Sequence, residues 1–151
     1  MTQNDAHVLQ ESSKFLWNSK IARVVVNVQH RFEDGYEPSD LDSLHLEFRQ
    51  LLSTPEGRKK YREVGSLWID TCTCGLRLEL AGQIAVACGD STEKVLARFK
   101  QLVGKMLVRV NVTSPGGDTE FVFEDGMIFR CFSATSHARL SWRLSTADQL
   151  A

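Results

Sequence analysis

Apolar residues in the first 66 positions recur mainly at helical spacing. Residues 5–20 carry a loose pattern that is compatible with a short helix. A clearer amphipathic helix is predicted to begin at Ser39 or Asp40, because apolar side chains then recur at intervals of three and four. These apolar positions are Leu41, Leu44, Phe48, Leu51 and Leu52. Residues 21–28 interrupt the helical pattern, since their β-branched side chains favour a strand.

A second helix is predicted to follow from Thr54 to Gly65. Thr54 and Pro55 are typical of a helix N-cap and first helical position, and Gly65 suits a helix end. Residues 1–66 are therefore expected to be mainly helical. The basic run at residues 58–62 is interpreted as a solvated face of this helix, with phosphate or nucleic-acid contact as the alternative.

From residue 67 onward the apolar pattern alternates with a period of two, which predicts strands. A long strand is expected over 67–80, followed by a tight turn at Ala81-Gly82 and a paired strand over 83–88. Asp90 or Ser91 is expected to cap a helix that ends at residue 103. The remaining strands are expected over 106–112, 119–124, 127–132 and 139–144.

These elements predict a single α+β domain over residues 1–151. Six or seven strands are expected to form one antiparallel meander sheet, with two or three helices packed on one face and the other face partly open. Residues 67–145 should be mainly β, and residues 146–151 should form a flexible tail. No repeat of fixed period is evident, and the length of 151 residues suits one domain.

Composition is that of an ordinary soluble protein. The chain holds 18 basic and 19 acidic residues, a net charge of -1, and 42% hydrophobic residues. The near-neutral balance argues against a dedicated nucleic-acid binder, whose domains are usually strongly basic. Neither a secretory signal nor an apolar stretch of the roughly 18 residues needed to span a membrane is found. We expect a bacterial, cytoplasmic protein with neither nucleic acid nor membrane as its partner.

The four cysteines are expected to be reduced thiols in such a compartment. They are Cys72, Cys74, Cys88 and Cys131. Cys72 and Cys74 share the apolar face of the strand predicted over 67–80, where a thiol packs as a small hydrophobe. Zinc sites usually repeat a pair of closely spaced cysteines, and this chain has one such pair. Core packing is therefore favoured over a metal site, and no cofactor is expected.

No specific catalytic motif is found: the sequence lacks a nucleophile elbow, a phosphate-binding loop and a zinc-protease motif. An enzyme or small-molecule binder is therefore an alternative hypothesis. It would use a cleft between the helices and the open sheet face. The polar candidates for that cleft are His30, Glu33, His137 and Arg139.

An acidic group surrounds one predicted hairpin near the end of the chain. Its members are Asp118, Glu120, Glu124 and Asp125. Glu120 and Glu124 are expected to point to one face, opposite two phenylalanines. Such a group is typical of edge protection and solubility, and also of a docking surface for a basic partner.

Four segments in the second half form a suggestive series. They are 75–80, the helix end at 102–105, the hairpin 120–126 and the closing 142–144. In this series the chain resembles small bacterial α+β domains, some of which are immunity proteins of toxin systems. The resemblance implies a binding role and transfers no functional residue. Our main hypothesis is a protein-binding protein, whose sharpest form is an immunity protein that neutralises a toxin by surface docking. A homo-oligomeric structural subunit is a further alternative.

Overall fold

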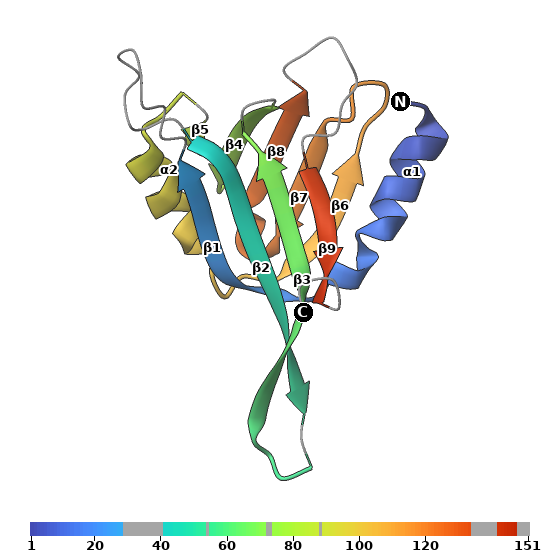
Figure 1. Cartoon of the computed structure of the whole chain (residues 1–151), viewed down its shortest axis with the longest axis vertical. Helices are drawn as coiled ribbons and strands as arrows, with labels where there is room; N and C mark the ends of the chain where they lie inside the picture. Colours follow the sequence, from blue (N-terminus) through green and yellow to red (C-terminus); the bar gives the residue numbers. More distant parts are fainter. Residues whose placement is uncertain (29–40, 54, 72–73, 88, 134–141, 148–151) are drawn as a thin grey trace.

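The computed structural model arranges the chain as two facing antiparallel sheets with helices at their sides (Figure 1). It describes residues 1–28, 41–53, 55–71, 74–87, 89–133 and 142–147. The first sheet consists, in spatial order, of β1 (Lys20–Val28), β2 (Leu41–Ser53), β3 (Lys59–Asp70) and β9 (Trp142–Thr146). The second sheet consists of β5 (Gln83–Ala87), β4 (Cys74–Leu80), β8 (Ile128–Ser133), β7 (Thr119–Phe123) and β6 (Leu107–Val112). The helices are α1 (Gln3–Ser12), α2 (Thr92–Phe99) and the 3₁₀ helices η1 (Lys14–Leu16), η2 (Lys100–Leu102) and η3 (Glu124–Gly126).

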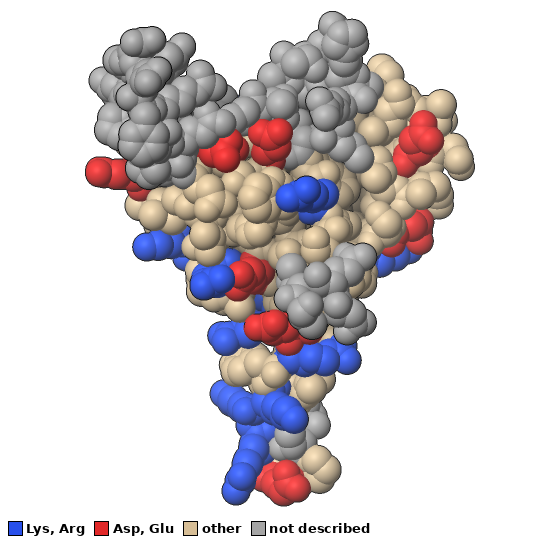
Figure 2. Space-filling model, in the orientation of Figure 1, with Lys and Arg blue, Asp and Glu red and all other residues tan. Residues whose placement is uncertain are grey.

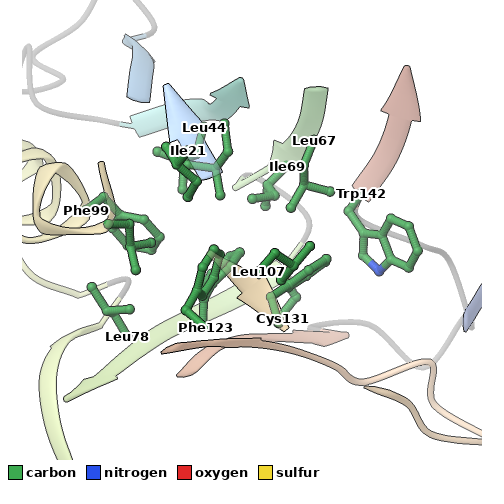
Figure 3. Close-up of a cluster of buried hydrophobic side chains, with 14 of the residues drawn as sticks. Ile21, Leu44, Leu67, Ile69, Leu78, Phe99, Leu107, Phe123, Cys131 and Trp142 are labelled. Atoms are coloured by element: carbon green, nitrogen blue, oxygen red, sulfur yellow. The ribbon is translucent and has the colours of Figure 1, made fainter. Parts of the chain in front are cut away.

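The core lies between the two sheets, whose side chains point toward one another (Figure 3). Alternate residues of the strands supply this layer, as in other packed sheets. Fully buried examples are Ile21, Leu44, Leu67 and Ile69 from the first sheet and Leu78, Leu107 and Phe129 from the second. Phe99 of α2 closes one side of the layer, because its ring centroid lies 5.1 Å from that of Phe129.

The predicted α+β class and the antiparallel pairing are confirmed, but the predicted single meander is wrong. The described strands divide into sheets of four and five. The helices do not pack on one face of a sheet: α1 contacts the edge strand β6, and α2 contacts β1 and β5. Each sheet instead covers the inner face of the other. Alternation along a strand reveals one buried face, but it does not say whether a helix or a second sheet buries that face.

The two helices predicted between residues 39 and 65 are also wrong, because β2 and β3 occupy this stretch. The buried apolar side chains of β2 are Leu44, Leu46 and Phe48, which alternate with period two. The spacing of Leu44 and Phe48 fits a helix equally well, so Leu46 is the residue that distinguishes the two periods. Among the described residues of the stretch 1–66, strand residues therefore outnumber helical ones, whereas a mainly helical stretch was expected.

Local signals in the second half are confirmed more closely. Ser91 caps α2, with its hydroxyl accepting a hydrogen bond from the Lys94 amide at 3.3 Å. Ala81 and Gly82 both have positive φ, 51° and 78°, as the tight turn of a two-residue hairpin requires. The strand predicted over 67–80 is divided, however: its start lies in β3 and its end in β4, in different sheets.

The free edge of β6 is covered by α1. Helix α1 packs beside this strand (Figure 1). The Gln10 side chain accepts a hydrogen bond from the Val112 amide at 2.9 Å, which occupies a donor that a further strand would otherwise use. The N-terminal helix thus closes one edge of the second sheet.

The described chain consists of two halves with the same order of elements. Each half begins with an α-helix, continues with a 3₁₀ helix and then has three strands. In the first half these are α1, η1, β1, β2 and β3, and in the second half they are α2, η2, β6, β7 and β8. The sequences correspond most closely at the junction of the 3₁₀ helix and the following strand. Here Leu16, Asn18, Ile21 and Val24 correspond to Leu102, Gly104, Leu107 and Val110. Asn18 and Gly104 both have positive φ, 64° and 83°.

Reciprocal hydrogen bonds join the two halves at this junction. The amide of Asn18 donates to Leu107 and that of Gly104 donates to Ile21, both at 2.8 Å. A second reciprocal pair runs from the Leu107 amide to Ser19 and from the Ile21 amide to Lys105, at 2.9 and 3.0 Å. Because each bond has its mirror in the other half, the halves are related by a local pseudo-twofold axis.

The fourth strand of each half is exchanged across this axis. The order β1-β2-β3 is completed by β9 of the second half, and β6-β7-β8 is completed by β4 of the first. The registers match as well. Leu67 pairs with Leu144 in the first sheet, and the corresponding Phe129 pairs with Leu78 in the second. Each sheet therefore contains strands from both halves of the chain.

Candidate docking surface

A long hairpin projects from the first sheet, beyond the body of the protein (Figure 1). We call residues 49–63 the arm. They comprise the outer parts of β2 and β3 and the residues between these strands. Its strands stay paired from Arg49 opposite Glu63 to Ser53 opposite Lys59. Residues 55–63 are all exposed, so the arm contributes little to the core. An ordered segment that buries so little apolar surface is unusual, because ordering the backbone of a residue costs about 1–2 kcal/mol of conformational entropy.

The second half of the chain shows that the fold does not need the arm. Phe48 pairs with Ile21 on one side and with Gly65 on the other. Phe123 lies in the same way between Leu107 and Met127, so Phe48 and Gly65 correspond to Phe123 and Met127. In the second half only η3 joins these positions, and the Phe123 amide donates to the Met127 carbonyl at 2.8 Å. The same hairpin thus closes in one half with a short turn and in the other with the arm.

The arm is basic. It holds Arg49, Arg58, Lys59, Lys60 and Arg62. With Glu56 and Glu63 its net charge is +3, whereas the rest of the chain has 13 basic and 17 acidic residues. Figure 2 shows lysine and arginine side chains gathered along it. The run at 58–62 therefore lies on a projecting hairpin rather than on the predicted helix face.

An apolar and aromatic cluster lies in the middle of the arm. Leu51 and Tyr61 are direct cross-strand partners and are 54% and 47% exposed. The Arg49 guanidinium lies 4.0 Å from the Tyr61 ring centroid, which is a cation–π contact. The arm therefore combines an exposed apolar pair with surrounding cations.

The acidic residues proposed for docking have partners within the chain. The Glu120 carboxylate pairs with Arg130, which also pairs with Glu79. Glu124 accepts a hydrogen bond from the Met106 amide at 3.1 Å, and Asp125 contacts Lys105 at 2.5 Å. The Asp125 contact raises the pKa of Lys105, mainly through that hydrogen bond. Docking of a basic partner at this hairpin stays a prediction.

Asp118, the remaining member of the acidic group, lies in the turn before β7. Its backbone carbonyl accepts hydrogen bonds from the amide and hydroxyl of Thr113, at 2.9 and 3.0 Å. This residue therefore takes part in closing the β6–β7 hairpin.

Replacing Arg130 with methionine should destabilise the protein by about 2 kcal/mol, because it leaves two half-buried carboxylates without their shared cation. Urea unfolding monitored by tryptophan fluorescence measures this change. The matched control is Arg23→Met, which breaks the exposed pair with Glu47 and should cost less than about 1 kcal/mol. Equal losses in the two variants would contradict the role assigned to Arg130.

On the outer face of the first sheet, the positions that correspond to Glu120 and Arg130 of the second sheet carry different side chains. His45, Trp68 and Arg143 are direct cross-strand neighbours there. The His45 and Trp68 rings meet edge to face at 4.0 Å, and the Arg143 guanidinium lies 4.7 Å from the Trp68 ring. Burial lowers the pKa of His45, which favours the neutral form of the ring that lies against Trp68. At these positions one outer face therefore carries paired charges, and the other carries an edge-to-face ring pair with an arginine over the Trp68 ring.

A cavity of about 620 Å³ opens on the first sheet where the arm leaves the body. Its lining includes Arg23, Glu47, Glu63 and Gly65. Arg23 is already held by Glu47, through contacts of 2.7 and 3.0 Å. The cavity does not lie between helices and a sheet, where the small-molecule hypothesis placed its cleft.

The residues of the small-molecule hypothesis lie outside the described part of the chain. These are His30, Glu33, His137 and Arg139. Cys72 and Cys88 lie outside it too, whereas Cys131 is buried in the core. Among the described residues no group of three or more metal-ligating side chains comes together.

Comparison with protein-family models, curated proteins and solved structures found no match to this chain. In the described residues no helix is long and apolar enough to cross a membrane. The functional proposals therefore depend on the geometry of the chain and on the differences between its two halves.

Proposed function

We propose that this protein is a protein-binding module that docks on its partner through the arm. The observation that carries this proposal is the contrast between the two halves. The fold closes the β7–β8 hairpin with η3 alone, yet at the corresponding place it extends an exposed basic hairpin. A segment that the fold can omit, and that offers both apolar and charged side chains to solvent, is well suited to recognition.

An immunity protein that blocks a toxin by surface docking is one form that such a module can take. It is distinguished from other binding modules by its effect, because the partner loses its activity in the complex. A homo-oligomeric subunit is distinguished by its mass, because the arm would then contact a second copy of the chain.

Trimming the arm should abolish partner binding and leave the fold intact. We would replace residues 49–64 with Asn-Asn-Gly, a turn built on the pattern of Glu124–Gly126. Asparagine and glycine tolerate the positive φ seen at Asp125 and Gly126. The unfolding midpoint should fall only slightly, because residues 55–63 are all exposed and Val64, just beyond the arm, is only partly buried against the core. Affinity capture from a lysate of the source organism, quantified by mass spectrometry, would compare the trimmed and intact proteins.

A matched control removes the same net charge elsewhere. Arg98, Lys100 and Arg109 are exposed and lie outside the arm, so their joint change to glutamine also removes three positive charges. This variant should retain the partner that the trimmed protein loses. A partner captured equally by the intact and trimmed proteins would refute docking through the arm, and unfolding of the trimmed protein would refute the correspondence between the halves.

A further inference from the structure

We propose that the arm recognises an acidic protein surface, with the Leu51–Tyr61 pair as its apolar anchor. This inference rests on the proposed docking function and names the chemistry of the partner. It follows from three observations: the uneven charge of the chain, the apolar cluster within the arm, and the internal pairing of charges on the second sheet.

Charge is distributed so that an acidic partner is attracted to one place. The arm has a net charge of +3, and the rest of the chain has four more acidic than basic residues. An acidic surface is therefore attracted by the projecting arm and repelled by the body. Complementary potentials of this kind orient two proteins before contact and speed their association.

The middle of the arm has the composition of a binding hot spot. Leu51 and Tyr61 expose apolar area side by side, and Arg49 is held against the Tyr61 ring. Tyrosine and arginine are enriched among the residues that contribute most to protein–protein affinity. Contact with a nucleic-acid backbone would need cations but would gain little from an exposed leucine. The apolar pair thus favours a protein over a nucleic acid as the partner.

The described outer face of the second sheet offers a weaker alternative surface. Arg130 lies between Glu79 and Glu120, so the charges on this face are paired with each other. A partner that docked there would have to break these contacts. The arm projects from the body, and its residues 55–63 are exposed, so a partner can reach its cations without displacing a neighbouring strand.

A selection of short random peptides displayed on phage tests the inference without knowledge of the natural partner. The library is selected separately on the intact protein and on the protein with the trimmed arm. Peptides enriched only on the intact protein should be rich in Asp and Glu and should contain a leucine or an aromatic residue. Arm-dependent peptides without acidic enrichment would overturn the inference, and so would the absence of arm-dependent peptides.

The selected peptides then separate the two contributions. Tyr61→Ala and Leu51→Ser should each weaken peptide binding about 10-fold, since truncated hot-spot residues lose on the order of 1–2 kcal/mol. Joint change of Lys59 and Lys60 to glutamine should mainly reduce the association rate and the salt dependence. Unchanged affinity in the Tyr61→Ala and Leu51→Ser proteins would overturn the anchor. All four side chains are exposed or half-exposed, so the variants should fold.

A fluorescein-labelled DNA duplex supplies the competing outcome. We expect no arm-dependent rise in anisotropy at about 150 mM salt, and no displacement of the peptide by the duplex. Duplex binding that requires the arm and displaces the peptide would assign the arm to nucleic acid and overturn the inference. These outcomes are distinct from failure of the proposed function, which is decided by whether the protein captured from the lysate depends on the arm.

Discussion

Two fragments produced by a cut between Gly89 and Asp90 should each fail to fold alone and should fold when mixed. The reason is the exchange of fourth strands: β4 of the first fragment lies in the second sheet, and β9 of the second fragment lies beside β3. Each fragment alone would lack three strands of the opposite sheet and would expose much of its inner apolar face to water, at about 25 cal/mol for each Å² of apolar area. Circular dichroism and urea titration of the separate and mixed fragments measure the effect.

A second fragment that ends at residue 141 provides the control. It lacks β9 and with it Trp142, whose indole donates to the Thr119 hydroxyl at 2.9 Å across the sandwich. This shorter fragment should restore much less structure on mixing. A cooperative unfolding transition in either isolated fragment would contradict the dependence of each half on the other.

Replacing Gly65 with alanine should destabilise the protein by about 3 kcal/mol. A Cβ at this position would lie 2.2 Å from the Ser145 carbonyl oxygen and 2.9 Å from the Phe15 ring. The first of these is backbone of the neighbouring strand β9, so it cannot move aside as a flexible side chain can. Overpacking of a well-packed site typically costs about 1–3 kcal/mol, and backbone contact places this variant at the upper end. Urea unfolding measures the loss.

Gly75→Ala is the matched control, because it is also a glycine within a strand of a sheet. A Cβ at Gly75 would meet Phe132 at 3.7 Å, an ordinary van der Waals distance. Alanine also loses less backbone entropy on folding than glycine, so this variant should be neutral or slightly more stable. Similar destabilisation in both variants would show that the β3–β9 approach at Gly65 is not the cause.

The sequence predicts local structure best where period and turn chemistry agree. The strand at 107–112 alternates clearly, and Ser91 is a standard cap, so both β6 and α2 occur close to where they were expected. The stretch 41–52 is ambiguous because leucine and phenylalanine there satisfy periods of two and of about four at once. Thr54-Pro55, which suggested a helix start, instead precedes Gly57 with its φ of 70°.

Pairing between distant strands is what the sequence does not reveal. The register of β4 with β8 and of β3 with β9 depends on contacts across the whole chain, and no local pattern encodes them. The duplication leaves one short signal, the shared spacing of apolar residues around Ile21 and Leu107. It occurs only twice, so it does not stand out as a periodic repeat does.

The candidate site illustrates the same limit. Composition identifies the basic run at 58–62 and the acidic group at 118–125 equally well. Only the fold shows that Arg130 and Lys105 lie beside the carboxylates, whereas the cations of the run project on a hairpin. Whether a charged group is available to a partner depends on its neighbours in space, which a linear pattern does not specify.

The contact between Gln10 and the edge of β6 has a consequence for aggregation. An open edge strand can pair with the same strand of another molecule, and repeated pairing leads to ordered polymers. Helix α1 and the Gln10 side chain prevent this step at β6, because the Val112 amide is already occupied. Fraying of α1 would expose the edge without unfolding the sandwich. The N-terminal helix, which packs Ala6 and Leu9 against the core, is therefore also expected to protect the folded protein against polymerisation.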